Sequence, residues 1–292
     1  MSADCLQRIG VVGAGTMGSG IAQVAAQSGF DVVLYDIDDH ILRRATDRIT
    51  HFVRRAAEKG RVTADEAEAA INRLQTTTAL EAFAGCDFLI EAAPEQLELK
   101  QSLFNRLDCI VPVHAVLATN TSTLSVTQIA SATQHPERVV GMHFFNPPPL
   151  MPLVEVAAGA MTSEETVHLT VEVAKCMGKT PVRTQDVPGF IVNRVARPFY
   201  LEGLRLLAQG VTDHATVDRL VREGGRFRMG PFELMDLIGL DINFAASRSV
   251  YEACFHEPRY RPSLLQQRMV ESGRLGRKVG RGWYEYGGEE KP

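Results

Sequence analysis

The sequence has few cysteines and no long apolar run. Its five cysteines are scattered, odd in number and without a C-x-x-C pair, which excludes a zinc knuckle or a disulfide framework and fits a reducing compartment. No apolar run approaches the length of a membrane span, and strand-like sequence from Arg8 onward leaves no room for a secretory leader. We therefore expect a soluble cytoplasmic protein with no metal site and no membrane partner.

A strong excess of charge is also missing. The net charge is −4 and the pI about 6.1, which argues against a nucleic-acid partner, although a local basic patch can hide inside such an average. The length of 292 residues and the apolar fraction of 45% allow two domains or one large one. Local motifs must therefore carry the functional information.

The first motif is a glycine-rich turn near the N-terminus. Arg8–Gly13 is a short apolar run of strand character, and a helical pattern through Ser28 follows the turn. In G-x-G-x-x-G the first glycine permits the tight turn, the second lets the backbone approach a pyrophosphate, and the third lets helix and strand pack closely. The order strand, turn, helix predicts a dinucleotide site that uses Gly13, Gly15, Thr16, Met17 and Gly18.

An acid after the next strand indicates which dinucleotide is bound. The run Asp31–Tyr35 leads directly into Asp36, which is placed to accept hydrogen bonds from the adenosine ribose. No arginine follows at once to bind a 2′-phosphate. The sequence therefore predicts NAD rather than NADP as the cofactor.

Residues 38–73 form a basic segment that does not lead directly into the next strand. Two helical patterns flank Gly60, and Thr63 with Glu66 resembles a capping box. We expect a helical hairpin that projects from the sheet. Two interpretations stay open: a solvated amphipathic face, or a clamp for a polyanion such as the phosphates of coenzyme A. Between residues 43 and 61 two acids stand against seven basic residues, namely Arg43, Arg44, Arg48, Arg54, Arg55, Lys59 and Arg61.

Strand-like runs then recur at Phe88–Ala92, Ala115–Thr119 and Val139–Phe144, with helical patterns between them. This alternation predicts a parallel sheet covered by helices on both faces, in which ligands bind beyond the carboxyl ends of the strands. Polar residues after those ends are therefore site candidates, although Ser122 could simply cap a helix. The candidates are Glu95, Asn120, Ser122, His143 and Asn146.

The stretch 139–156 contains the strongest candidate for acid–base chemistry. Three consecutive prolines force a loop after the histidine, and a second apolar run carries one carboxylate. Glu155 can therefore fold back towards His143. A histidine beside a carboxylate has a fixed tautomer and orientation, as removal of a proton from an alcohol requires, but a structural histidine is the commoner case.

The pattern changes to helices only near Asp186. We predict a Rossmann-type domain over residues 1–187, with the hairpin inserted at about 38–73, and an all-α domain over residues 188–292. The fold class is thus α/β with a mostly parallel sheet, followed by a helical domain. That second domain would close a substrate cleft and supply apolar helix faces for a homodimer. Asn193 lies on the first turns of its first helix.

These motifs together resemble the L-3-hydroxyacyl-CoA dehydrogenase family over essentially the whole chain, and most closely its bacterial 3-hydroxybutyryl-CoA type. The resemblance rests on GVVGAGTMGSGIA, IEAAPEQLELK, TNTSTL, GMHFFNPPPLMPLVEV, DVPGFIVNR and GRKVGRGWYEY. It implies the NAD-dependent, reversible oxidation of a (3S)-3-hydroxyacyl-CoA to the 3-ketoacyl-CoA. An acyl-CoA is the implied small-molecule partner.

The resemblance also implies roles for single residues. His143 would be the catalytic base and Glu155 its orienting partner. Ser122 and Asn193 would lie around the reacting oxygen, together with Asn146, and Lys59 would lie near the coenzyme A phosphates. Cofactor contacts beyond the glycines would be Asp36, Glu95, Lys100 and Asn120. Phe52 departs from the family, because some members place a serine there.

Two rival interpretations remain. One is a dehydrogenase of the same architecture that acts on a free hydroxy acid or sugar acid, in which the basic hairpin would hold no coenzyme A. The other is an NAD-binding protein without catalytic turnover.

Overall fold

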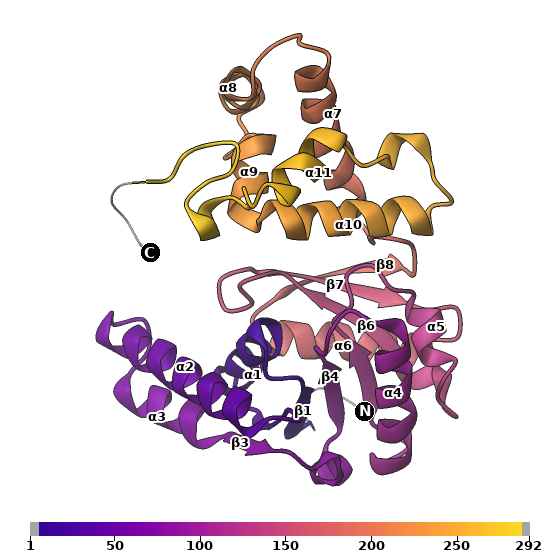
Figure 1. The fold of residues 1–292 in the computed structure, drawn as a ribbon. Coiled ribbons are helices and arrows are strands. Elements are labelled where there is room, and N and C mark those ends of the chain that lie inside the picture. The colour runs from indigo at the N-terminus through magenta and orange to yellow at the C-terminus, as the bar shows by residue number, and fades with distance from the viewer. Residues whose placement is uncertain (1–5, 288–292) are drawn as a thin grey trace. The chain divides into compact units, whose positions relative to one another are not determined.

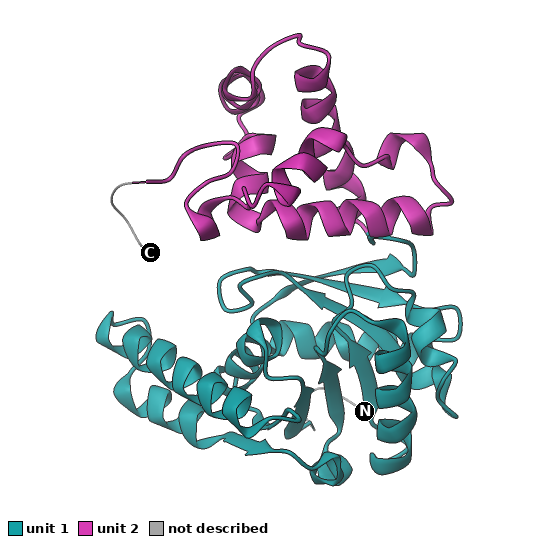
Figure 2. Cartoon of the chain, in the orientation of Figure 1, with its two compact units in different colours: residues 1–190 teal, residues 191–292 magenta. Residues whose placement is uncertain are grey.

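The computed structural model describes residues 6–287, and the chain divides into two compact units, residues 1–190 and 191–292 (Figure 2). The predicted boundary after Val187 lies slightly before this division. Each unit has its own apolar core, as a structural domain does.

Unit 1 is built on one sheet of eight strands in the order β3-β2-β1-β4-β5-β6-β7-β8 (Figure 1). All pairs are parallel except β6 with β7, and β8 runs parallel to β7. The loop that the prolines impose after β6 lets the chain reverse direction. The strands are β1 (Arg8–Val12), β2 (Asp31–Tyr35), β3 (Leu74–Thr77), β4 (Phe88–Glu91), β5 (Val116–Thr119), β6 (Val139–Phe144), β7 (Leu153–Ala158) and β8 (Thr180–Gln185).

Helices cover both faces of this sheet, and an apolar cluster forms on each face. The alternation of buried strand residues between the two clusters follows from the two-residue side-chain period of a strand. The helices of unit 1 are α1 (Thr16–Gln27), α2 (Asp39–Glu58), α3 (Ala64–Asn72), α4 (Leu97–Ile110), α5 (Val126–Ala130) and α6 (Glu164–Cys176).

The predicted hairpin insertion is present as α2 and α3, which lie side by side (Figure 1). Thr63 and Glu66 form the expected capping box at the start of α3. An exposed ion pair of 3.0 Å joins Arg54 to Glu68 across the two helices. The acids of α3 thus neutralise part of the positive charge of α2.

Unit 2 is helical, as predicted. Its core gathers side chains such as Leu201, Phe232 and Met235, with the single tryptophan, Trp283, packed against them. Helix α7 continues through Pro198. The helices are α7 (Val192–Ala208), α8 (His214–Gly225), α9 (Pro231–Ile238), α10 (Leu240–Ala253) and α11 (Leu264–Glu271).

The predicted fold class is confirmed, with two differences of detail. The sequence analysis gave no residue range for β3 and no strand for β8, because their LQTT and TPVRTQ segments lack an apolar run. It also placed His143 beyond a strand end, whereas His143 is the fifth residue of β6. The buried run continues to Phe144 because this strand is covered on both faces.

Candidate active site

The glycine turn between β1 and α1 has the shape that a dinucleotide needs. Gly13 has a φ of +96°, and a Cβ on Gly18 would stand 1.7 Å from the carbonyl oxygen of Gly13. A Cβ on Gly15 would meet nothing within 4 Å. The first glycine therefore makes the turn, the third allows close packing, and the second faces open space where a pyrophosphate could approach.

The residues around this turn also suit an anionic cofactor. No side chain caps the N-terminus of α1, so its first-turn N–H groups and positive dipole end are available to phosphates. Thr16 is exposed and Met17 half-buried. Asp36 follows β2 directly, and its Oδ2 accepts from the backbone N–H of Ala14 at 2.8 Å. This bond holds the carboxylate beside the glycine turn, where the ribose of NAD would lie.

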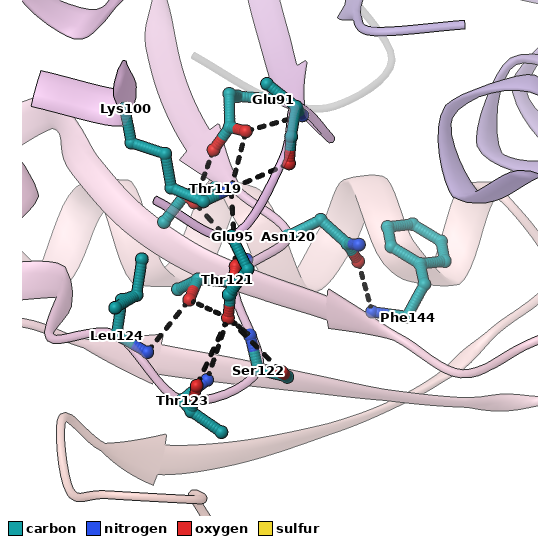
Figure 3. Close-up of polar contacts among 11 residues, drawn as sticks. Glu91, Glu95, Lys100, Thr119, Asn120, Thr121, Ser122, Thr123, Leu124 and Phe144 are labelled. Carbon is teal, nitrogen blue, oxygen red and sulfur yellow. Dashed lines mark hydrogen bonds and ion pairs between the residues drawn. The ribbon is translucent and has the colours of Figure 1, made fainter. Parts of the chain in front are cut away.

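A buried ion pair lies behind the ends of β4 and β5 (Figure 3). Lys100 and Glu91 are each 1% exposed, and Lys100 Nζ donates to Glu91 Oε1 at 2.6 Å. The other carboxylate oxygen of Glu91 accepts from Thr119 Oγ1 at 2.6 Å. Lys100 also forms a longer ion pair with Glu95 at the rim of the sheet, with 3.5 Å between Nζ and Oε2.

Glu95 in turn holds the loop that follows β5 (Figure 3). Its Oε1 accepts from Thr121 Oγ1 at 2.7 Å, from the backbone N–H of Ser122 at 2.8 Å and from that of Thr123 at 3.1 Å. Burial opposes the charge on Glu95, but Lys100 and these donors outweigh it and lower the pKa of the carboxyl. Glu95 is therefore ionised near neutral pH and fixes the position of Ser122.

Asn120 connects this loop to the strand that carries the histidine. Its backbone N–H donates to the carbonyl of Glu91 at 2.7 Å, and its Oδ1 accepts from the backbone N–H of Phe144 at 2.8 Å (Figure 3). These two hydrogen bonds of Asn120 link the carboxyl ends of β4, β5 and β6 to one another.

His143 and Glu155 form a buried pair on neighbouring strands. They are directly opposite in the antiparallel register of β6 and β7, and His143 Nδ1 lies 2.8 Å from Glu155 Oε2. Because a carboxylate only accepts, this hydrogen bond assigns a proton to Nδ1, and in the neutral imidazole Nε2 then keeps its lone pair. The rings of Phe145 and Phe190, with centroids at 4.6 and 5.8 Å, contact the imidazole and restrict its orientation.

The proline loop after β6 packs against the nucleotide helix. A Cβ on Gly20 of α1 would stand 2.8 Å from Pro148, so the glycine permits this close approach. Lys179 Nζ donates to the carbonyls of Pro148 and Met151 at 2.6 and 3.1 Å. The loop that carries Asn146 is thereby anchored on both sides.

The structure thus gathers some of the predicted site residues and leaves others apart. Asp36 and the glycines lie together, and Glu95, Lys100, Asn120 and Ser122 form one network. Asn146 is exposed in the proline loop, and Lys59 is exposed at the C-cap of α2. Asn193 belongs to unit 2.

Sequence reasoning missed two residues that hold this arrangement, Glu91 and Lys179. A signal existed for Glu91, because a carboxylate ended an otherwise apolar strand. Lys179 carried no such signal, since an isolated lysine before a strand looks like any surface residue.

The fold and the glycine turn define a Rossmann-type dehydrogenase unit followed by a helical domain. Residues 8–187 match the family profile described as 3-hydroxyacyl-CoA dehydrogenase, NAD binding domain, and residues 189–286 match 3-hydroxyacyl-CoA dehydrogenase, C-terminal domain. The chain belongs to the 3-hydroxyacyl-CoA dehydrogenase family. The predicted resemblance, the enzyme class and NAD as the cofactor are confirmed.

Named relatives match over nearly the whole chain. A 3-hydroxyadipyl-CoA dehydrogenase of Escherichia coli is 47% identical over 98% of this chain, which spans 60% of that relative's length. A probable 3-hydroxybutyryl-CoA dehydrogenase of Deinococcus radiodurans is 43% identical over 96% of this chain and 100% of the relative. The crystal structure of (S)-3-hydroxybutyryl-CoA dehydrogenase from Ralstonia eutropha has a TM-score of 0.93 at 37% identity, covering 97% of this chain and 100% of its own.

Over residues 6–287, no helix has both the length and the apolar character that crossing a bilayer requires.

Proposed function

We propose that the chain catalyses the reversible, NAD-dependent oxidation of the 3-hydroxyl of a (3S)-3-hydroxyacyl-CoA to the 3-ketoacyl-CoA. The observation that supports this most directly is the buried pair of His143 and Glu155, 2.8 Å apart. A buried imidazole held by a carboxylate is suited to take a proton from an alcohol.

In this proposal Nε2 of His143 removes the hydroxyl proton. Glu155 keeps the proton on Nδ1 and stabilises the imidazolium that forms. Ser122, fixed by Glu95, and Asn146 hold the substrate oxygen, and Asn193 is a predicted further contact from unit 2. Bound NAD supplies the hydride acceptor, and the glycine turn with Asp36 holds it. In the reverse direction the imidazolium returns the proton.

The first test compares thioester with free acid. We expect NADH to be oxidised with acetoacetyl-CoA, followed at 340 nm, and not with the same concentration of acetoacetate. Activity on the free acid would favour the hydroxy-acid dehydrogenase. Inactivity on every thioester, with NAD binding intact, would favour a protein without turnover.

Replacement of His143 tests the proposed base. His143→Ala should lower kcat by roughly 10²–10⁴-fold, the usual contribution of general acid–base catalysis. The affinity for NAD, measured by fluorescence titration, should change little. His135→Ala is the matched control, since His135 also lies beside a glutamate, 3.2 Å from Glu137, but on the surface. Wild-type turnover in His143→Ala would refute the assignment.

We further propose that the α2–α3 hairpin holds the phosphates of coenzyme A. Among the described residues, Arg55 and Lys59 have no ion-pair partner, whereas Arg54 is already paired with Glu68. Arg55→Gln with Lys59→Gln should therefore raise KM for acetoacetyl-CoA more than Arg54→Gln does. An unchanged KM in the double variant would exclude the clamp and leave a solvated helix face.

We also propose a cytoplasmic homodimer that forms through unit 2. Large apolar side chains of this unit are exposed in the single chain, including Val195 at 69%, Leu220 at 62% and Leu264 at 70%. Sedimentation equilibrium should give twice the chain mass of 32.1 kDa. A monomer at micromolar concentration would rule this out.

A further inference from the structure

The loop between β6 and β7, residues 145–152, carries Asn146, one of the residues predicted to contact substrate. Most of this loop is exposed, but Pro148 in its middle is buried. The side chain of Asn146 can hold a substrate only if contacts elsewhere fix the backbone that carries it. The residues that contact the buried proline are therefore candidates for positioning Asn146.

Helix α1 provides the first of these contacts. Gly20 is buried in this helix, and a Cβ at its position would stand 2.8 Å from Cδ and 2.9 Å from Cγ of Pro148. The φ of Gly20 is not positive, and a glycine inside a helix is less favourable than an alanine. Gly20 also lies outside the G-x-G-x-x-G motif, which ends at Gly18. The space that Pro148 occupies is therefore the structural reason for a glycine here.

Lys179, directly before β8, provides the second contact. Its Nζ donates to the carbonyl of Pro148 at 2.6 Å and to that of Met151 at 3.1 Å. Over residues 6–287 no carboxylate forms an ion pair with this lysine, and partial burial lowers its pKa. Hydrogen bonds from a charged donor are stronger than those between neutral groups. The ammonium group therefore holds two carbonyls of the loop in place.

The loop is also closed by its own backbone. The N–H groups of Leu150 and Met151 both donate to the carbonyl of Pro147, at 3.0 and 3.1 Å. Residues 147–151 thus form one compact turn, and this turn begins directly after Asn146. A contact that holds any part of the turn therefore restricts Asn146 as well.

We propose that Gly20 and Lys179 are positioning residues for the reaction, because together they fix the turn at residues 147–151 and so place Asn146 at the substrate oxygen. The inference deepens the proposed function and rests on it for the role of Asn146. Helix α1 begins at the glycine turn, so one helix places both the cofactor and the loop that meets the substrate. Neither positioning residue touches the substrate itself.

Replacement of Lys179 tests the hydrogen-bonded side of this arrangement. Lys179→Met should lower kcat/KM for acetoacetyl-CoA by roughly 10–100-fold, because a displacement of about 1 Å can cost about 10²-fold. The affinity for NADH, measured by fluorescence titration, should not change. Lys179→Arg should restore most of the activity, since a guanidinium can also donate to two carbonyls. Lys175→Met is the matched control, because Lys175 is exposed and pairs with Glu172 at 2.7 Å. Wild-type kcat/KM in Lys179→Met overturns the proposal.

Replacement of Gly20 tests the packed side. Gly20→Ala should also lower kcat/KM for acetoacetyl-CoA by roughly 10-fold or more, because the new methyl group displaces Pro148, and it should leave the affinity for NADH unchanged. Gly203→Ala is the matched control: this glycine of α7 also packs on a proline, with a Cβ 3.1 Å from Cγ of Pro231, and its replacement should leave kcat/KM unchanged. An equal loss of NADH affinity and of kcat/KM in Gly20→Ala overturns the proposal, since the effect would then lie at the cofactor.

A double variant shows whether the effect passes through Asn146. In a protein that already carries Asn146→Ala, Lys179→Met should lower kcat/KM by no more than about 2-fold, because residues that act as a unit are not additive. The full 10–100-fold loss in that background would mean that Lys179 acts through another group, and it overturns the proposal.

Hydrogen exchange separates this inference from the proposed reaction. The amides of Leu150 and Met151 should exchange faster in Lys179→Met than in the wild type, whether or not any thioester is turned over. If the wild type turns over no thioester, the proposed function fails, and faster exchange still supports the placement of the loop by Lys179. Unchanged exchange overturns that placement, even in an active enzyme. If Lys179→Met does not fold, Lys179→Arg and Gly20→Ala decide by the same two measurements.

Discussion

The two units treat buried positive charge differently. Among residues 6–287, three lysine or arginine residues are buried, and the two in unit 1 each have a carboxylate partner. Lys100 pairs with Glu91 at 2.6 Å, and Arg138 pairs with Asp108 at 2.7 Å. Within the same described residues, Arg197 of unit 2 has only neutral acceptors.

The difference affects how much each buried cation contributes to the free energy of unfolding. A buried cation loses its hydration, and only a well-placed anion recovers most of that free energy. In unit 1 the recovery is internal, since each pair joins helix α4, which carries Lys100 and Asp108, to another segment of the same unit. In unit 2 this recovery is incomplete among the described residues, because the hydrogen-bond acceptors of Arg197 are neutral.

The largest expected effect comes from breaking the pair at Arg138. Asp108→Asn should reduce the free energy of unfolding by about 3–5 kcal/mol, because it leaves a buried charge without an anion. Urea denaturation followed by circular dichroism measures this. Glu68→Gln, which breaks the exposed pair with Arg54, should cost no more than about 1 kcal/mol. Equal costs for the two variants would contradict the importance of burial.

Removing the charge of Glu91 should have a smaller effect. Glu91→Gln should cost about 1.5–3 kcal/mol, the range for a hydrogen bond to a charged group, because Glu95, 3.5 Å from Lys100 Nζ, remains as a partial partner. If Glu95 moves towards Lys100, it releases Ser122, so KM for the thioester should rise as well. A loss of stability with unchanged kinetics would show that the network does not position Ser122.

Replacing the buried arginine of each unit tests the difference between the two units directly. Arg197→Met should cost only about 1–3 kcal/mol, because it leaves neutral acceptors unpaired. Arg138→Met should cost more, about 3–5 kcal/mol, because it strands the buried charge of Asp108. Urea denaturation of Arg197→Met can be followed by the fluorescence of Trp283, the single tryptophan, which packs in the unit 2 core. A larger cost for Arg197→Met would reverse the comparison.

The smallest expected effect is a difference in acid response. The pKa of Glu95 is lowered, so its contribution to stability is present above the unfolded value of about 4.3 and is lost as pH falls through the folded pKa. The stability advantage of wild type over Glu95→Gln should therefore shrink on acidification. Solvent screening keeps this effect small, because the side chain is 36% exposed.

Asp218 of unit 2 should respond in the opposite sense. Burial raises its pKa, although donors including Phe232 and Tyr284 oppose this. Its contribution is therefore present below the unfolded value of about 3.9 and is lost as pH rises through the folded pKa. The stability of wild type relative to Asp218→Asn should therefore fall as pH rises above the unfolded pKa. Parallel pH responses in the two variants would contradict these pKa directions.

The sequence predicted local structure wherever an apolar pattern repeats or a motif requires a particular backbone conformation. The glycine turn, the acid after β2, the strand–helix alternation and the change to helices beyond Asp186 each follow from periodicity or from steric limits. The pairing of His143 with Glu155 was also foreseeable, since the prolines between two apolar runs force the chain back on itself. β8 was missed because an exposed edge strand has no apolar signal.

The tertiary structure alone decided which charges meet. Glu91 and Lys100 are close in sequence, but Arg138 and Asp108 are not, and nothing in the residues around Arg197 distinguished it from Arg205 on the same helix. Whether a charge is buried, and whether an anion faces it, depends on packing between elements distant in sequence, such as α7 with α10. Short-range sequence patterns do not encode those distances, because they arise only when the elements come together.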